Sequence, residues 1–254
     1  MLPVSVAFGV LIGLCLGLLG GGGAILTVPI FVYVLGFGVK ESIAMSLAVV
    51  GATSLVGAAG HWRDGHVRRR VALVFGAVAM VGTYLGTRLA TWLTGAQQLA
   101  IFAVAIVTAA VIMLRRRRTD DRHGGDSRGP SSLRGVFTAA SGLAVGSLTG
   151  LVGIGGGFVI VPTLVWGGLP MRDAVGTSLV TIAMNCVVGF LSYLGDVPIS
   201  WMAIALVTVG TIPGIAIGTY LIRFLSQETL RRAFAVLLFG LAAYLLYRNL
   251  PALL

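Results

Sequence analysis

Long apolar segments separated by short charged loops run through nearly the whole chain, and they leave few folds open to it. About ten of them approach the roughly 20 apolar residues that a helix needs to cross a lipid bilayer. Of the 254 residues, 57% are hydrophobic and only 10% are charged, against about 25% charged residues in an average soluble domain. The sequence therefore predicts an all-α polytopic membrane protein.

The net charge of +10 comes mostly from arginine. In a soluble protein such a charge would indicate a nucleic-acid partner. Here the arginines lie between apolar segments, so we interpret them as topology signals that face lipid headgroups, with the lipid bilayer as the partner and no nucleic acid. Both cysteines, Cys15 and Cys186, lie within apolar segments and are interpreted as small packing residues.

The two halves of the sequence carry one pattern twice, shifted by 132 or 133 positions, as from Gly9 to Gly142. The matched positions in the first half include Gly9, Gly13, Gly17, Gly20, Gly22, Gly23, Pro29, Ser46, Gly57, Asp64, Gly82 and Gly86. Their counterparts are Gly142, Gly146, Gly150, Gly153, Gly155, Gly156, Pro162, Ser178, Gly189, Asp196, Gly214 and Gly218. We infer a first membrane repeat at 1–114, a basic linker at 115–134 and a second membrane repeat at 135–254.

Each repeat is predicted to contain five helical segments. In the first they cover 4–19, 24–38, 42–60, 71–93 and 99–114. In the second they cover 136–152, 158–169, 174–194, 201–225 and 230–247. The linker is charged and rich in Gly, Ser and Pro, which predicts a solvated connection.

The loops predict how the repeats are oriented. The third and fourth segments of the first repeat are joined by a loop with Arg63 and Arg68, whereas the matching loop at 195–200 has no basic residue. Between the fourth and fifth segments the bias reverses, because there the second repeat has Arg231 and Arg232. The positive-inside rule then places the linker in the cytoplasm and both termini in the periplasm. An odd number of crossings per half makes the two halves inverted-topology repeats, an arrangement common in secondary transporters. The same parity holds if the first two segments of each half form a re-entrant pair.

A run of glycines interrupts the start of each repeat. Adjacent glycines cannot continue a rigid helix cheaply, and irregular backbone at membrane depth is tolerated where protein or a water-filled cavity surrounds it. We expect a helix, a break and a second helix whose free N–H groups and positive dipole end favour an anion. Pro29 and Pro162 would bend or end that second helix. The candidate binding glycines are Gly20, Gly21, Gly22 and Gly23 in the first repeat and Gly153, Gly155, Gly156 and Gly157 in the second.

Glycines spaced by four residues have another explanation, since Gly9 and Gly13, or Gly82 and Gly86, lie on one helix face and favour close helix packing. The third segments add polar residues that are candidates for donating hydrogen bonds to an anion, with hydrogen bonding between helices as the alternative role. They are Ser46, Thr53 and Ser54 in the first repeat and Thr177, Ser178 and Asn185 in the second.

The sequence lacks the residues that several other functions require. No acidic residue lies well inside an apolar segment, which disfavours a cation carrier. No catalytic set, metal-ligand cluster or nucleotide-binding loop is present, so we expect no enzyme activity and no cofactor. A secondary transporter of small anions is the leading hypothesis. An anion channel and a non-transporting membrane subunit or sensor remain as alternatives.

The glycine-rich stretches GLLGGGGAILTVP at 17–29 and GLVGIGGGFVIVP at 150–162 resemble those of the TauE/SafE family of sulfite exporters and related carriers. The resemblance implies a multi-pass carrier of the bacterial inner membrane that moves sulfite, organosulfonates or related small anions by alternating access. A homodimer is also compatible with it. Ala24 departs from the longer glycine run of the second stretch, so the two glycine runs need not contribute equally.

Overall fold

The computed structural model describes residues 2–115, 131–153, 155–166, 168–221 and 240, and within these ranges the chain forms helices, turns and no strand. The core of the expected linker, the loop with Arg231 and Arg232, the last expected segment at 230–247 apart from residue 240, and the carboxyl terminus lie outside the described residues. The all-α prediction is confirmed for the part of the chain that the structure describes.

The described helices coincide with the expected segments. In the first half they are α1 (Leu2–Leu19), the 3-10 helix η1 (Gly20–Leu26), α2 (Thr27–Pro29), the π-helix η2 (Ile30–Val34), α3 (Val39–Arg63), α4 (Arg69–Thr91) and α5 (Gly95–Arg115). In the second half they are α6 (Ser131–Val152), α7 (Gly157–Trp166), α8 (Met171–Tyr193) and α9 (Trp201–Leu221).

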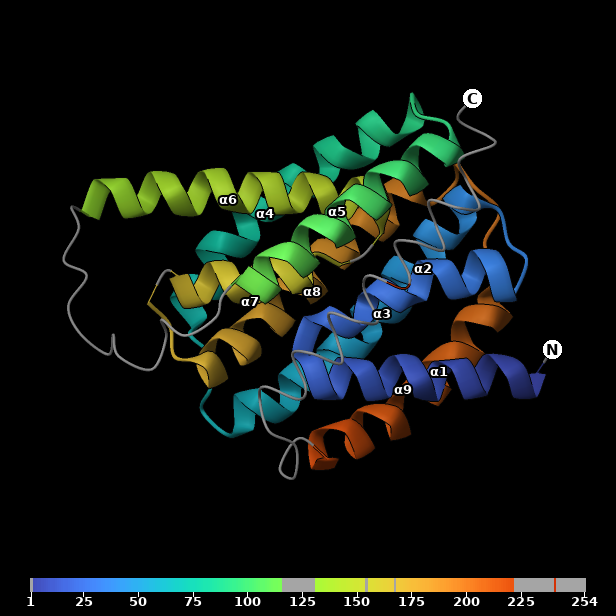
Figure 1. Cartoon of the computed structure of the whole chain (residues 1–254), viewed down its shortest axis with the longest axis horizontal. Helices are drawn as coiled ribbons and strands as arrows, with labels where there is room; N and C mark the ends of the chain where they lie inside the picture. Colours follow the sequence, from blue (N-terminus) through green and yellow to red (C-terminus); the bar gives the residue numbers. More distant parts are fainter. Residues whose placement is uncertain (1, 116–130, 154, 167, 222–239, 241–254) are drawn as a thin grey trace.

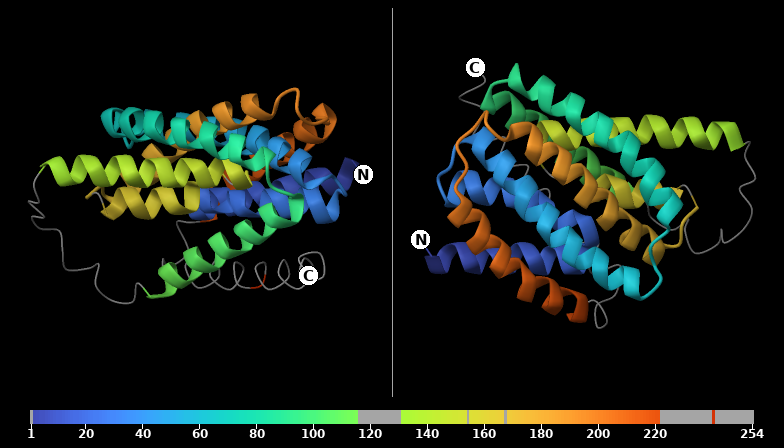
Figure 2. Two further views of the ribbon diagram at one scale, coloured as in Figure 1. Left: turned by 90° about the horizontal axis from the view of Figure 1, so that it is seen from above. Right: turned by 180° about the vertical axis from the view of Figure 1, so that it is seen from behind.

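Helices of one half pack mainly on helices of the other. The first helix of the chain, α1, lies along α9, while α6 lies along α4 (Figure 1). In the middle of the bundle α3 packs on α8. The green helix α5 leaves the rest of the bundle obliquely in the left view of Figure 2 and contacts only α3 and α6 substantially among the described helices.

Glycines set the close approach of the outer pairs. A Cβ added to Gly13 would overlap the carbonyl oxygen of Thr211 in α9, and one added to Gly214 would overlap that of Val10 in α1. The α4–α6 pair is built in the same way. Added Cβ atoms there would overlap backbone carbonyls from both sides, at Gly82, Gly86, Gly146 and Gly150. The prediction that glycines spaced by four residues serve helix packing is confirmed at these positions.

The two ends of the bundle differ in charge pairing. At one end, called here the Arg68 end, Asp173 in the first turn of α8 accepts a hydrogen bond of 2.6 Å from Arg68 Nε and lies 3.1 Å from His66 Nδ1. At the other end, called the Asp196 end, α4 finishes near exposed Trp92 and α9 begins at exposed Trp201. There Lys40 Nζ donates to the Thr91 carbonyl at 3.4 Å.

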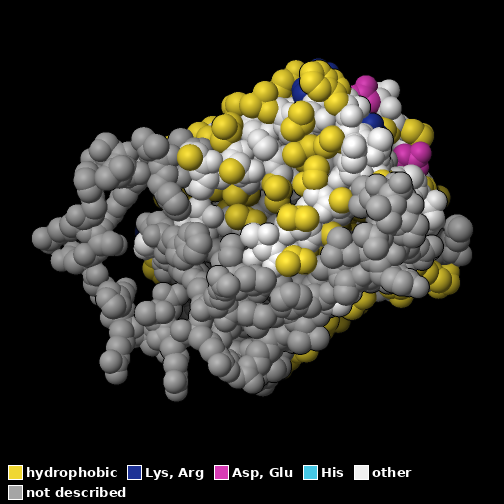
Figure 3. Space-filling view, turned by 45° about the horizontal axis from the view of Figure 1, so that its top comes forward, with side chains coloured by type: hydrophobic (Ala, Val, Ile, Leu, Met, Phe, Trp, Pro, Cys, Tyr) yellow, Lys and Arg dark blue, Asp and Glu magenta, His cyan; other side chains and the backbone are white. Residues whose placement is uncertain are grey.

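Apolar side chains cover much of the outside of the bundle. Figure 3 shows hydrophobic side chains across the described part of one face, with the charged ones gathered at one edge. Four described helices are long and apolar enough to cross a membrane: Val39–Arg63, Arg69–Thr91, Asp173–Tyr193 and Trp201–Gly218. Shorter apolar helices accompany them, so the number of crossings in each half stays a prediction.

Paired glycine segments as a candidate anion site

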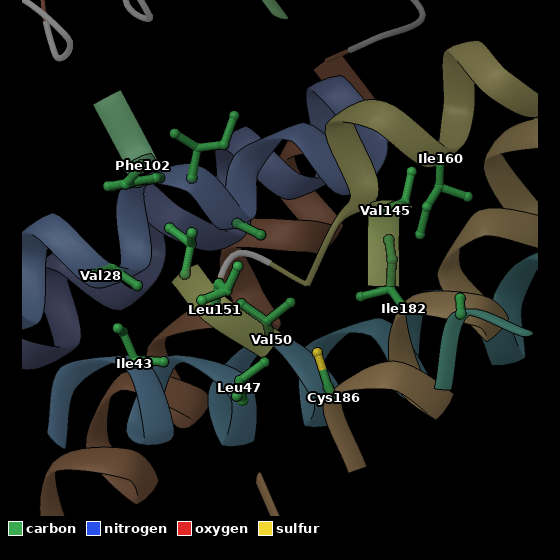
Figure 4. Packing of buried hydrophobic residues seen from close by; sticks show 14 of the residues in the cluster. Val28, Ile43, Leu47, Val50, Phe102, Val145, Leu151, Ile160, Ile182 and Cys186 are labelled. Atoms are coloured by element: carbon green, nitrogen blue, oxygen red, sulfur yellow. The ribbon is translucent and has the colours of Figure 1, made fainter. Parts of the chain in front are cut away.

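The glycine segments of the two halves lie close together. The 3-10 helix η1, which contains the first glycine segment (residues 20–23), contacts both α7 and α8. Residues next to each segment, among them Ala24, Val28, Val152 and Ile160, belong to one buried cluster (Figure 4). Segments 130 or so residues apart in sequence are thus brought to one place, at the contact between the two halves.

The two segments have different backbones. The first forms a 3-10 helix that joins α1 directly to α2, without an open turn between them. In the second glycine segment (residues 153–157) Gly153, Gly155 and Gly156 have φ of 75°, 68° and 70°, which side-chain-bearing residues rarely adopt. Only the second glycine segment therefore breaks the helix sharply, whereas a break was expected in both halves.

The sharp turn places the amino terminus of α7 inside the protein. Val159 N and Ile160 N both donate to the Gly156 carbonyl at 3.0 Å and so close the first turn of α7. The N–H groups of Gly157 and Phe158 precede any acceptor within α7, because the first turn of a helix has no partner for its donors. These donors and the positive end of the helix dipole point back toward the turn.

The turn is held directly against the two central helices. A Cβ on Gly155 would lie 2.8 Å from Val50 Cγ1 of α3 and 3.0 Å from Ile182 Cγ2 of α8. From Cys186 Sγ it would be 3.4 Å away. Glycine lets the backbone amides approach α3 and α8 here without a side chain between them.

Of the three polar candidates on α3, Ser46 contacts the turn directly. Ser46 Oγ donates to the Gly153 carbonyl of the other half at 2.8 Å, and both atoms are buried. Thr53 Oγ1 donates to the Val49 carbonyl at 2.6 Å and is 2.9 Å from Thr211 Oγ1 of α9. Ser54 Oγ is buried and has no hydrogen-bond partner among the described residues.

The polar residues of α8 do not all lie together. Thr177 Oγ1 accepts a hydrogen bond of 3.0 Å from Arg68 N at the Arg68 end, and Ser178 Oγ donates to the Val175 carbonyl of its own helix. Asn185 is fully buried, and neither its Nδ2 nor its Oδ1 has a partner in the described part of the chain. It stands on α8 between Ile182 and Cys186, the two α8 residues nearest to Gly155. A buried amide without partners lowers the stability of the folded protein. Asn185 is therefore a candidate for binding a ligand.

A small cavity of about 30 Å³ lies between α1, α3, α8 and α9. Its lining includes Gly17, Thr53, Gly57 and Leu179. Such a volume holds one or two water molecules.

Comparison with known proteins agrees with this arrangement. Residues 5–245 match the family described as "Sulfite exporter TauE/SafE". The chain belongs to the TauE/SafE family. Two relatives are each named "Probable membrane transporter protein". One, from Xylella fastidiosa strain 9a5c, is 32% identical over 99% of this chain and 97% of its own length, and the other, YdhB of Bacillus subtilis, is 26% identical over 92% and 94%.

A third relative of this TauE/SafE protein, "Probable membrane transporter protein MJ0441" of Methanocaldococcus jannaschii, is 29% identical over 76% of this chain and 73% of its own length. No solved structure matches the chain. Family and relatives show a membrane transporter of the TauE/SafE type, and the apolar helices agree with a multi-pass membrane protein.

The TauE/SafE fold also buries hydroxyl groups that the sequence did not single out. Thr27 directly follows η1, is fully buried and has no described partner for its Oγ1, and the same holds for Ser42 at the start of α3. A hydroxyl four residues after the end of a glycine run is the signal that points to Thr27. Pro29 ends α2 where the π-helix begins, whereas Pro162 lies inside α7, which continues to Trp166, so Pro162 does not end that helix.

Proposed function

We propose that this TauE/SafE protein is a secondary transporter that binds a small anion, sulfite or an organosulfonate, between its two glycine segments. The observation that carries the proposal is the open turn at Gly153, Gly155 and Gly156, which places the first turn of α7, whose amides have no acceptor within that helix, against α3 and α8. Backbone amides at a helix amino terminus can bind an anion without help from a basic side chain. Asn185 adds a buried side-chain amide whose donor Nδ2 has no partner in the described protein.

The binding chemistry fits an oxyanion. Sulfite and sulfonates present several negatively charged oxygens, each of which accepts hydrogen bonds. Backbone N–H groups, the Nδ2 of Asn185 and the hydroxyl of Ser54 are donors of the required kind. Neutral donors bind such an ion without the strong ion pair that would slow its release to the other side.

We further propose that the halves are inverted-topology repeats and that the transporter works by alternating access. The exchanged packing supports this: contacts advance along α1 and α9 together, from Gly9 beside Val207 to Gly13 beside Thr211. They also advance together along α6 and α4, so each first helix runs parallel to the fourth helix of the other half. Since α4 begins at the Arg68 end and α9 begins at the Asp196 end, α1 and α6 run in opposite directions.

The charges at the two ends of the bundle indicate which end faces the cytoplasm. We place the Arg68 end in the cytoplasm of a bacterial cell, since its loop carries the arginines. There Asp173 ties α8 to the α3–α4 loop through Arg68 and His66. Breaking this tie would open the site to the cytoplasm, and separation of α4 from α8 at the Asp196 end would open it to the periplasm.

The test is counterflow in proteoliposomes that contain only this protein. Sulfite, thiosulfate, sulfonates, sulfate and short carboxylates would first be screened for thermal stabilisation of the purified protein, because a ligand stabilises the state that it binds. An anion that stabilises the protein should then exchange across the membrane with saturation. Large single-channel currents would instead identify an anion channel, and absence of flux would identify a subunit or sensor.

A variant pair links flux to the turn. Gly156→Leu should abolish counterflow, because its side chain would overlap Thr149 Oγ1 and fill the turn. Gly36→Leu is the matched control, since Gly36 has φ of 76° and an added Cβ meets nothing within 4 Å. Wild-type counterflow in correctly inserted Gly156→Leu protein would refute the proposed site.

A further inference from the structure

A second cavity, with no residue of the glycine segments in its lining, opens on the outside of the bundle at the Asp196 end. It lies between α4 and the last turns of α8 and has a volume of about 470 Å³. Tyr84 and Arg88 line it from α4. Leu191, Ser192 and Asp196 line it from α8 and the turn that follows.

The cavity lies at the level where a membrane meets water. Trp92 follows α4 one turn after Arg88 and is 86% exposed, and Trp201 at the start of α9 is 63% exposed. Exposed tryptophans at helix ends gather at the headgroup level of membrane proteins. Toward the middle of the bundle the cavity continues into outward-facing apolar side chains, of which Leu191 is 60% exposed. One end of the cavity is therefore polar and the other faces the acyl region.

The two charges in the cavity are not paired with each other. Arg88 Nε donates to the Tyr84 hydroxyl at 3.2 Å, and its Cζ lies 5.3 Å from the centre of the Tyr84 ring. This contact holds the guanidinium beside the cavity and leaves its other N–H groups free to bind an oxyanion. Asp196 lines the same cavity and makes no ion pair with any described cation within 4.0 Å.

We propose that this cavity binds the headgroup of an aminophospholipid, a lipid that carries a phosphate and a primary ammonium group. Arg88 binds the phosphate, Asp196 accepts hydrogen bonds from the ammonium group, and an acyl chain lies along Leu191. A simple dianion fits the cavity less well, because the Asp196 carboxylate repels it and the apolar wall offers it nothing. A choline headgroup has no N–H to donate to Asp196, which gives the site a preference for a primary amine.

The test measures thermal stabilisation of the detergent-purified full chain by phosphatidylethanolamine, phosphatidylcholine and phosphatidylglycerol, with native mass spectrometry to count bound lipids. Phosphatidylethanolamine should bind best. Arg88→Gln should weaken its binding by about tenfold or more, since a hydrogen bond to a charged group contributes at least that factor. Asp196→Asn should remove the preference over phosphatidylglycerol.

The control variant is Lys40→Gln, which removes a cation from the same end of the bundle without altering the lining of the cavity. Its lipid preference should match that of the wild type. Equal binding of all three lipids by the wild type, or an unchanged preference in Asp196→Asn, would overturn the proposal. Stabilisation by free sulfate or phosphate that is lost in Arg88→Gln would also overturn it, because the cavity would then be an entry point for anions.

Discussion

Replacing Gly153 by alanine tests whether the turn between α6 and α7 is fitted against α3. Gly153 has φ of 75°, so any residue with a side chain costs about 1–2 kcal/mol there from backbone strain alone. The added Cβ would also lie 3.0 Å from both Cα and the carbonyl oxygen of Ile43 and 2.8 Å from its Cγ2. Crowding against backbone in a packed interior costs roughly 1–3 kcal/mol more. The expected total destabilisation is about 2–5 kcal/mol.

Gly36→Ala separates the two contributions. Gly36 has nearly the same φ, 76°, yet an added Cβ meets no atom within 4 Å, so only the strain of about 1–2 kcal/mol should appear. Thermal unfolding in detergent, followed by tryptophan fluorescence, would compare both variants with the wild type. In soluble domains of this size 1 kcal/mol shifts the Tm by about 2–4 °C, so Gly153→Ala should melt a further ~2–12 °C below Gly36→Ala. Equal melting of the two variants would refute the close contact between the turn and Ile43.

Two further predictions concern helix packing and the Arg68 end. Gly146→Ala should destabilise the protein by about 1–3 kcal/mol, because its Cβ would overlap the Ala79 carbonyl. Gly60→Ala, on an open face of α3, should instead stabilise it by about 0.5–1 kcal/mol. Denaturant titration of both variants checks that the two changes in unfolding free energy have opposite signs. Asp173→Asn should lower the Tm only slightly, because its partner Arg68 is 61% exposed, and should remove part of the salt dependence of the Tm. An unchanged salt dependence would contradict the ion pair.

The glycine pattern allowed much of the helix packing to be predicted. Four-residue spacing identified Gly13 and Gly146 as interface residues, since spacing of this kind fixes a helix face without any knowledge of the partner. The helix on which each of these glycines packs could not be predicted from the spacing. That Gly13 meets α9 of the other half depends on how the helices assemble, and only the matching glycine spacing in Gly214 and Gly218 hinted at it.

The backbone of the glycine segments was harder to predict. Both runs were expected to break the helix, yet the first continues as a 3-10 helix and only the second turns sharply. Glycine permits either conformation at little cost, so surrounding contacts decide between them. One such contact, from Ser46 to the Gly153 carbonyl, joins residues 107 apart in sequence, so the local sequence around either residue does not predict it.

The polar residues of α8 illustrate a related limit. Thr177, Ser178 and Asn185 were grouped by their helix alone, but Thr177 binds the backbone of Arg68 at the end of the bundle. Asp173 lies one turn earlier and pairs with the same arginine. Charge pairing across the two halves was not evident in the sequence, because the partners lie more than 100 residues apart.

Counterflow by Asn185→Leu protein, measured together with its Tm, tests most directly whether the paired glycine segments hold the transported anion. The amide of Asn185 has no described partner, so an apolar side chain of similar size should leave the Tm unchanged or raise it. Anion exchange should nevertheless fall by tenfold or more, about the contribution of one hydrogen bond to a charged group. Thr181→Val, four residues earlier, is the control and should keep wild-type exchange, because Thr181 Oγ1 already donates to Thr177 within α8. Wild-type exchange by a stable Asn185→Leu protein would contradict an anion site at this contact.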